Sequence, residues 1–466
     1  MKRRETFKLI PLALAGAGSL PSSSRAIETP QPVPGQSVPG QPGPGPEPLS
    51  LTYTNNVMRM LRKVRETQSD TILEGAYAIA RTVKAGRKVW SCWDLGHTNE
   101  ADLFPGRNGQ PEILTAGYET DKVKDGDLVL ANFPWPKGYI EDIAKRDLFI
   151  IGGPCPWGGD VKGFENIVPD IQKLKVRPFA DIWIETFVDH IGAQVRIPGS
   201  PAPLGPESGP LNGTILWMMI ADACRILARD GVSAKVKGDE PKLSGDSAPW
   251  VSLDRPLMDD YFDEVMRQLE LIGSELGDIR KMADMAVDTL LGGGNVYFYS
   301  RYFPALAGEA TGRRGGFVFA RGLSDDGRME GTSKDCVIMG TYKPDDEADL
   351  KNLDEFKKRG MRVASIGPVT RNNAIPDSRS VHKETEVHVG RMCDTYGLFA
   401  VPGFEQKICP TSGILATSIL WVMSTELAMG IIRRTGNTPA INFNGALTWA
   451  GSYNAKMTAL ARERGY

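Results

Sequence analysis

The sequence predicts an α/β protein built from two tandem copies of one domain. The first observation is that three motifs recur at one offset, 204 residues from Pro198 to Pro402. A shared offset across separate motifs indicates an internal duplication whose unit is a whole domain. The second observation is that short apolar strands bounded by glycine alternate with helices, which is typical of a parallel sheet covered on both faces. The motif pairs are Ile197–Gly199 with Val401–Gly403, Gly205–Gly209 with Cys409–Gly413, and Ile215–Trp217 with Ile419–Trp421.

The composition is ordinary for a globular protein and narrows the classes of partner. The chain has 466 residues, of which 41% are hydrophobic and 24% charged, and its formal net charge is −2. This length allows about two to three domains, each able to bury a core. A near-neutral charge gives no electrostatic footprint for nucleic acid or an anionic membrane, so we expect neither partner.

Residues 1–26 have the features of an export signal. Arg3 and Arg4 precede a modest apolar run, Ile10–Leu20, which is similar to a twin-arginine signal. We therefore expect a periplasmic or extracellular protein, with an ordinary N-terminus as the alternative. The apolar run is too short to cross a bilayer, so we expect no membrane span in the mature protein. Residues 27–50 are rich in Pro, Gly and Gln and should form an extended tether.

The six cysteines are scattered and lack Cys-x-x-Cys spacing, which argues against a zinc knuckle and a disulfide framework. We expect buried free thiols; one or two disulfides are the alternative if the protein is exported. No nucleotide-binding motif occurs, and we expect neither a metal nor another cofactor. The cysteines are Cys92, Cys155, Cys224, Cys336, Cys393 and Cys409.

The first domain, predicted over 51–255, opens with apolar residues at helical spacing. This spacing predicts one or two amphipathic helices within Val57–Lys84. Four apolar runs then predict strands, and a long helix over Gly213–Arg229 closes the domain. The predicted strands are Lys88–Trp93, Asp127–Asn132, Asp147–Gly153 and Asp181–Ile184.

The second domain, predicted over 256–466, repeats this order. Val296 follows Val89 by 207 residues and Asp335 follows Asp127 by 208, so the offset changes only by loop insertions. The duplication therefore covers roughly 200 residues twice. The predicted elements are helices at Tyr261–Ile272 and Ile279–Leu291 and strands at Asn295–Tyr299, Asp335–Ile338 and about Lys358–Ser365.

Together these features resemble a known family, because each half is similar to a sugar isomerase (SIS) domain. The resemblance rests on the segments in which a glycine precedes the first strand of each half, and on the loop Leu95–Asn99. It also rests on the second strands, which begin with Asp, and on the helix start Pro410–Gly413. The tail Asn442–Asn454 is similar to that of a bacterial subgroup of phosphosugar-binding proteins. The resemblance covers about residue 57 to the C-terminus. It implies two flavodoxin-like domains with five-stranded parallel sheets, which form a pseudo-dimer within one chain and could pair further as a homodimer.

The loops expected to bind phosphate depart from the family pattern. In an open parallel sheet, ligands bind beyond the carboxyl ends of the strands. The loop after the second strand reads Asn132–Pro136 in the first half and Thr341–Asp345 in the second, and proline has no N–H to donate. Two interpretations stay open. Aromatic residues such as Trp135 could stack on an unphosphorylated sugar, with Lys343 supplying a positive charge, or they could pack a decayed site.

Interconversion of an aldose and a ketose needs a base and an acid. The resemblance suggests Glu426, on the helix after Pro410–Gly413, as the base. His97 and Glu100 lie in the first-strand loop, and His388 lies in a charged run that a solvated connector would also explain. Structural roles at the surface or at helix ends are the alternatives for each. The predicted ligand-binding residues are Ser300, Glu309, Thr341, Lys343, Thr411, Ser412, Asn132, Trp135 and Ser208.

The leading hypothesis is an exported SIS-type protein that binds a sugar or sugar phosphate between its halves and interconverts aldose and ketose forms. A non-catalytic sugar-binding or sensing protein is the first alternative, and a sugar lyase or etherase is the second. Pro410–Gly413 keeps two hydroxyls, whereas Pro206–Gly209 has a carboxylate at one of these positions. We therefore expect the working site in the second half, around Thr411, Ser412 and Glu426.

Overall fold

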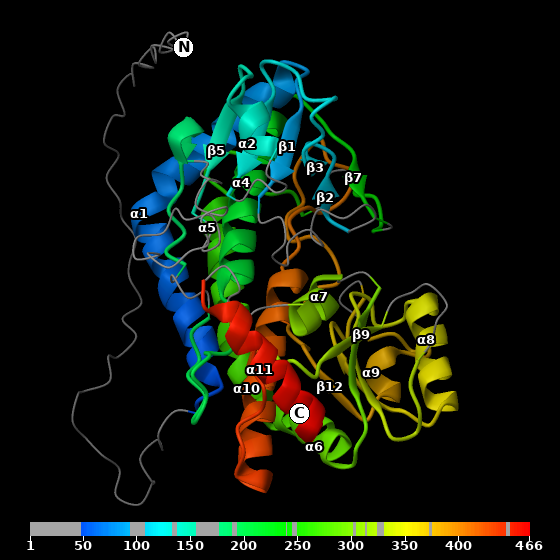
Figure 1. Cartoon of the computed structure of the whole chain (residues 1–466). Helices are drawn as coiled ribbons and strands as arrows, with labels where there is room; N and C mark the ends of the chain where they lie inside the picture. The colour runs from blue at the N-terminus through cyan, green and yellow to red at the C-terminus, as the bar shows by residue number, and fades with distance from the viewer. Residues whose placement is uncertain are drawn as a thin grey trace, which may run out of the picture. The chain divides into compact units, whose positions relative to one another are not determined.

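Two five-stranded parallel sheets, one in each half of the chain, organise the structure (Figure 1). Residues Glu47–Tyr466 form one compact unit of this computed structural model. We call 51–255 the first half and 256–466 the second half. The structure describes residues 48–93, 108–132, 138–154, 177–188, 193–238, 240–244, 249–301, 304–312, 315–323, 330–371, 375–443 and 448–466.

The first sheet has the strand order β3-β1-β4-β5-β6. All four residues of β1 and of β4 are buried, as expected for central strands of a sheet covered on both faces. The four predicted strands are present, and the short edge strand β3 is an addition. The strands are β1 (Val89–Cys92), β3 (Thr115–Ala116), β4 (Leu128–Ala131), β5 (Phe149–Gly152) and β6 (Ile182–Trp183).

The second sheet has the order β12-β11-β10-β8-β9, which repeats the first sheet strand for strand. The run around His388 forms strand β12 and its histidine is buried, so a solvated connector is wrong for this residue. Pairing with β11 buries it, because Ser365 lies opposite His388 in the register. The strands are β8 (Val296–Ser300), β9 (Arg321–Leu323), β10 (Cys336–Gly340), β11 (Arg362–Ile366) and β12 (Val387–Val389).

Long helices lie between and around the sheets. The N-terminal helical region is a single helix, α1 (Leu51–Lys84), whereas its counterpart in the second half is divided by a 3-10 turn, Ile272–Glu275. The helix predicted to start at Gly213 starts earlier, at Ser208. The other helices are α2 (Gly138–Ile143), α4 (Ser208–Arg229), α5 (Met258–Leu271), α6 (Leu276–Leu291), α7 (Pro304–Gly312), α8 (Glu347–Lys358), α9 (Val381–Glu384), α10 (Ser412–Thr435) and α11 (Ala450–Arg464).

The helices α4 and α10 are the centre of a core that both halves share. α4 packs on α1, α5 and α10, while α10 packs on α6 as well. Trp217 and Trp421 are fully buried at matching positions of the two helices. Both helices are long and apolar enough to cross a membrane. In each, 94% of the 18-residue segment that is apolar enough is buried within the protein. The five cysteines among the described residues are buried free thiols.

Reciprocal backbone contacts join the halves. The N–H of Gly205 donates to the carbonyl of Gly315, and the N–H of Cys409 donates to the carbonyl of Gly109, both at 3.0 Å. Gly109 and Gly315 both have positive φ values, 76° and 88°. A Cβ on Gly315 would lie 3.0 Å from the Cβ of Ala193, so glycine permits this close approach. Each half thus contributes a loop to the start of the other half's long helix, as a pseudo-dimer requires.

Candidate functional site

A tyrosine anchors the start of α4. Tyr53 of α1 is fully buried, and its hydroxyl donates to the carbonyl of Pro206 at 2.8 Å. Gly205 makes the turn before Pro206 with a φ of 82°, a value that glycine adopts without strain. A Cβ at this position would lie 2.9 Å from Cδ2 of Tyr53. Gly205 and Pro206 therefore hold the start of α4 directly against the ring of Tyr53.

Two buried carboxylates from opposite halves lie near that hydroxyl. Glu207 is the N-cap residue of α4 and is fully buried, while Glu309 lies on α7 and is 2% exposed. Burial raises the pKa of Tyr53 well above its usual value, and the charges of Glu309 and then Glu207 raise it further. The phenol therefore stays protonated at neutral pH. Gln194 donates its amide to Glu207 at 3.3 Å, and Ser208 is buried beside it.

The second half repeats this scaffold with different polar groups. Tyr261 donates its hydroxyl to the carbonyl of Pro410 at 2.9 Å. The N-cap residue of α10 is Thr411, which donates to Oδ2 of Asp394 at 3.4 Å, and Gln268 donates to the same oxygen at 2.8 Å. Burial raises the pKa of Asp394. Ser412 is buried as the first residue of α10, as Ser208 is in α4, so the two helix starts differ at the N-cap, where α10 has Thr411 and α4 has Glu207.

The predicted residues Ser300, Thr341 and Lys343 meet at the carboxyl edge of the second sheet. Ser300 ends β8 opposite Gly340, and Thr341 follows Gly340 directly. Thr341 donates its hydroxyl to the carbonyl of Lys343 at 2.5 Å. Lys343 is 5% exposed. Its ammonium nitrogen lies 5.0 Å from the centroid of the Tyr342 ring, within the range of a cation–π contact.

The helix α7 links this edge to the carboxylate pair. Leu306 of α7 lies over Gly340, where a Cβ would come within 2.6 Å of its Cδ2. Because Gly340 has no side chain, α7 can pack onto the end of β10. The same helix carries Glu309 toward Tyr53 of the first half. The fold thereby connects the carboxyl edge of the second sheet with the start of α4.

Glu426 lies apart from Thr411 and Ser412. It follows Ser412 by fourteen residues on α10, a separation of about 21 Å along a helix. Its carboxylate accepts from the hydroxyl of Ser50 at 2.7 Å and lies 3.2 Å from Nε of Arg280. This arrangement secures the start of α1 to α10. The structure therefore does not bring Glu426 together with the other residues predicted for the working site.

His388 is a buried member of the second sheet. Its Nδ1 lies 2.8 Å from the hydroxyl of Ser365, which also lies 2.8 Å from the hydroxyl of Thr385. Burial lowers the pKa of His388 to about 3, with smaller contributions from the charges of His382 and Arg391. The imidazole is therefore neutral at physiological pH and has no proton to give as an imidazolium acid.

Several predictions fall outside the described residues: the export signal at 1–26, most of the tether, and the side chains of His97, Glu100 and Trp135. Asn132 is described and is fully buried at the end of β4. Within the described ranges, no group of three or more His, Cys, Asp or Glu is placed to hold a metal ion.

Sequence reasoning missed the pairing of Glu207 and Glu309 around Tyr53. From the sequence, Glu207 stands out only as a replacement for the hydroxyl of Thr411. A usable signal is present, because Tyr261 follows Tyr53 by 208 residues, close to the offset between Pro206 and Pro410. Which residues of opposite halves surround each tyrosine depends on long-range packing.

Similar proteins are found for this chain among solved structures. No protein-family model and no curated protein sequence matches it. Among solved structures, it is similar to a Salmonella typhimurium LT2 protein provisionally described as sugar-binding, at 10% identity and a TM-score of 0.40, over 82% of this chain and 98% of that one. A Clostridium difficile 630 protein provisionally described as a phosphosugar isomerase gives 10% identity, a TM-score of 0.43, and coverage of 84% and 94%.

A third similar structure is a Thermotoga maritima glucosamine-6-phosphate deaminase, at 12% identity and a TM-score of 0.40, over 83% of this chain and 95% of that one. These similarities extend over both halves. The topology of this chain itself confirms the predicted fold, since two sheets of one strand order follow each other. The chain is a tandem α/β duplication, similar to solved structures described as sugar-binding and phosphosugar isomerase proteins.

Proposed function

We propose that this protein is a SIS-type protein that binds an unphosphorylated sugar at the start of α4, between its two halves. The observation that carries the proposal is the pair of buried carboxylates, Glu207 and Glu309, that flank Tyr53. Carboxylates accept hydrogen bonds from sugar hydroxyls. Two negative charges in a buried setting also repel a phosphate. The charge of this position therefore favours a neutral ligand over a sugar phosphate.

We further propose that the bound sugar is interconverted between aldose and ketose forms. The reaction moves a proton between adjacent carbons, and a carboxylate is a suitable base for that step. Glu309 is the proposed base, because α7 carries it from the carboxyl edge of the second sheet to the boundary between the halves. Glu207 is the proposed partner that holds the sugar hydroxyls.

The test follows solvent deuterium into sugars. The purified protein is incubated in D₂O with a panel of unphosphorylated aldoses and ketoses and with their phosphate esters, and NMR measures incorporation at the carbon next to the carbonyl. We expect incorporation into an unphosphorylated sugar, and a fall of at least about 100-fold in Glu309→Gln, the scale of general-base catalysis. Glu426→Gln is the matched control, because it removes a buried glutamate that binds Ser50 and Arg280.

Two outcomes separate the alternatives. Thermal stabilisation by a sugar without deuterium incorporation would leave a non-catalytic sugar-binding protein. Incorporation that is equal in the wild type and in Glu309→Gln would contradict the assignment of the base.

We also propose export through the twin-arginine-like segment. The support is the Arg3 and Arg4 pair followed by a modest apolar run. Fractionation of cells that express the full chain should place the wild type outside the cytoplasm and the variant Arg3→Lys/Arg4→Lys inside it. The variant Arg25→Lys should be exported like the wild type. Equal distribution of all three proteins would contradict export by this route.

A further inference from the structure

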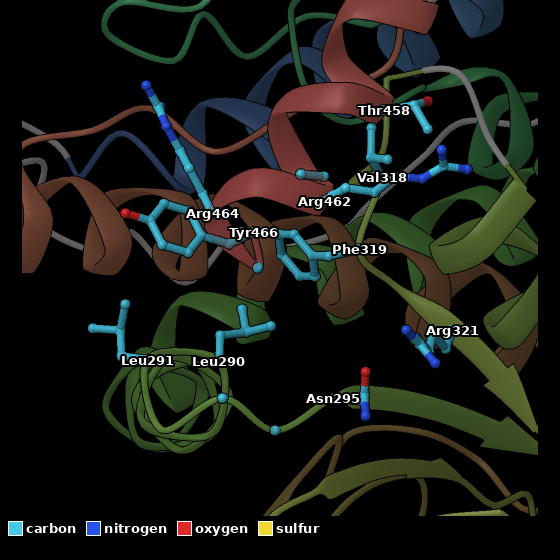
Figure 2. Close-up of a pocket in the computed structure, with 14 residues that line it drawn as sticks. Leu290, Leu291, Asn295, Val318, Phe319, Arg321, Thr458, Arg462, Arg464 and Tyr466 are labelled. Carbon is cyan, nitrogen blue, oxygen red and sulfur yellow. The ribbon is translucent and has the colours of Figure 1, made fainter.

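A cavity of about 640 Å³ lies at the amino end of the second sheet, away from Ser300 and Thr341 (Figure 2). Its walls come from the end of α6, the turn before β8, the start of β9 and the last turns of α11. This volume lies in the range of roughly 300–1,000 Å³ that is usual for small-molecule sites. Nothing in the proposed sugar site uses this cavity.

One side of the cavity is apolar. Leu290 and Leu291 of α6 line it together with Phe319 and Tyr466. Leu291 is 40% exposed, which is unusual for so large an apolar side chain beside a cavity. Such a surface gains free energy when an apolar ring or chain covers it.

The other side is cationic. Arg321 and Arg462 line it, and Figure 2 shows Arg462 extending past Val318, toward the side on which Arg321 and Asn295 lie. No ion pair joins either arginine to a carboxylate among the described residues. By contrast, the nearby Arg434 is held by the carboxylate of Asp288. Two guanidinium groups beside a low-dielectric wall add positive potential to the cavity, while the carboxylates of Asp335 and Glu330 act on Tyr297, the residue that binds Arg321.

Two of the polar groups are held in place. Burial raises the pKa of Tyr297, and a hydrogen bond from Arg321 partly offsets that rise, so the phenol positions this guanidinium. Asn295 donates its amide to Oδ1 of Asp335 at 2.9 Å. Figure 2 shows the amide oxygen of Asn295 turned toward the cavity. That oxygen can accept a hydrogen bond from a ligand hydroxyl.

We propose that this cavity binds a small molecule that joins one oxyanion to an apolar ring or chain. Arg321 and Arg462 bind the oxyanion, since guanidinium groups form strong charge-assisted hydrogen bonds with it. Leu290, Leu291 and Phe319 cover the apolar part. The site is independent of the sugar site, because it lies at the opposite end of the sheet.

The probe for the test is 8-anilinonaphthalene-1-sulfonate, which has an oxyanion on an aromatic body and fluoresces when it is bound in an apolar site. The neutral counterpart is N-phenyl-1-naphthylamine. Fluorescence titrations should give at least tenfold weaker binding of the sulfonate to Arg321→Gln and to Arg462→Gln than to the wild type. Binding of the neutral probe should stay unchanged in both. Added salt should weaken only the sulfonate complex.

Arg464→Gln is the matched control. This arginine lies on the same helix and also lines the cavity, but its side chain extends away from Arg462 and Arg321 in Figure 2, so sulfonate affinity should stay within about twofold of the wild type. Thr458→Trp fills the cavity and should weaken both probes. Sulfonate binding that is equal in the wild type, Arg321→Gln and Arg462→Gln would overturn the proposal, as would equal loss in Arg464→Gln or unchanged binding of both probes to Thr458→Trp.

Discussion

At matching positions of the two sheets, the first half has Gly152 against Trp183 and the second has Ser365 bonded to His388. The registers are equivalent, since Gly152 pairs with Trp183 and Ser365 with His388 at the same sheet edge. A Cβ on Gly152 would lie 3.0 Å from the Trp183 ring, so glycine makes room for the indole. One backbone arrangement therefore supports an apolar pair in the first half and a titratable pair in the second.

At the starts of α4 and α10, by contrast, the titratable group is in the first half. The first half has Glu207 at the start of α4, close to Glu309, whereas the second half has Thr411 at the start of α10. The tyrosine bonds that fix both helix starts are the same. The duplication thus preserves the contacts that position the backbone, while charge is distributed differently between the two copies. This contrast directs the sugar proposal to the first helix start rather than the second.

The largest difference between the halves should appear in the carboxylates that secure the long helices. Asp222 of α4 pairs with Arg225 at 2.6 Å, accepts from the N–H of Met258, and is fully buried. Removing one partner of a buried pair costs about 3–5 kcal/mol, and we expect this loss in the free energy of unfolding for Asp222→Ala. Glu426→Ala should lose only about 1–2 kcal/mol, because its partner Arg280 is half exposed.

Chemical denaturation at neutral pH measures both variants. Equal losses of unfolding free energy in Asp222→Ala and Glu426→Ala would contradict the view that burial of the arginine partner determines the loss. A change in the denaturant dependence of either variant would indicate an altered unfolded state.

The titratable sheet edge should make the second half sensitive to acid. The pKa of His388 is lowered to about 3 in the folded state, so the unfolded chain binds its proton first as the pH falls. The stabilisation that neutral His388 contributes to the folded state is fully present above about pH 6.5 and is lost toward about pH 3. The loss is about 1.4 kcal/mol per pH unit. A shift from about pH 6.5 to about pH 5 should therefore lower the free energy of unfolding by about 2 kcal/mol.

The variant Ser365→Gly/His388→Trp imports the apolar pair of the first half. Its free energy of unfolding should depend less on pH than that of the wild type between pH 7 and pH 5. His388→Gln alone tests the same slope if the double variant packs poorly. An unchanged slope in both variants would assign the acid sensitivity to other groups.

The smallest difference between the halves should appear in the two tyrosines. Tyr53→Phe and Tyr261→Phe each remove a buried hydrogen bond to a proline carbonyl, at 2.8 and 2.9 Å. Each should lower the free energy of unfolding by about 1–3 kcal/mol, because the carbonyl loses its donor. The two losses should agree within about 1 kcal/mol. Thermal and denaturant unfolding of the pair measure this, and a much larger loss for one tyrosine would break the proposed equivalence of the two scaffolds.

The sequence predicted the duplication and most of the strands, because apolar runs and constant offsets are local signals. It missed β12, since the run before His388 carries charged residues and its burial depends on pairing with Ser365. It suggested Glu426 as a base but did not predict that its carboxylate secures the start of α1. The bond between Ser50 and Glu426 joins residues 376 positions apart, and no local pattern records it. The grouping of Glu207 with Glu309 has the same origin in packing between the halves.

The most direct test of the sugar site compares a neutral sugar with its own phosphate ester. Saturation-transfer NMR on the full chain measures binding of both to the wild type, to Glu207→Gln/Glu309→Gln, and to Thr411→Val as the control at the other helix start. We expect a neutral sugar to bind the wild type and Thr411→Val alike, and binding to fall at least tenfold in the double glutamine variant. Binding of the phosphate ester alone, or equal binding of the neutral sugar to all three proteins, would contradict a neutral-sugar site at the start of α4.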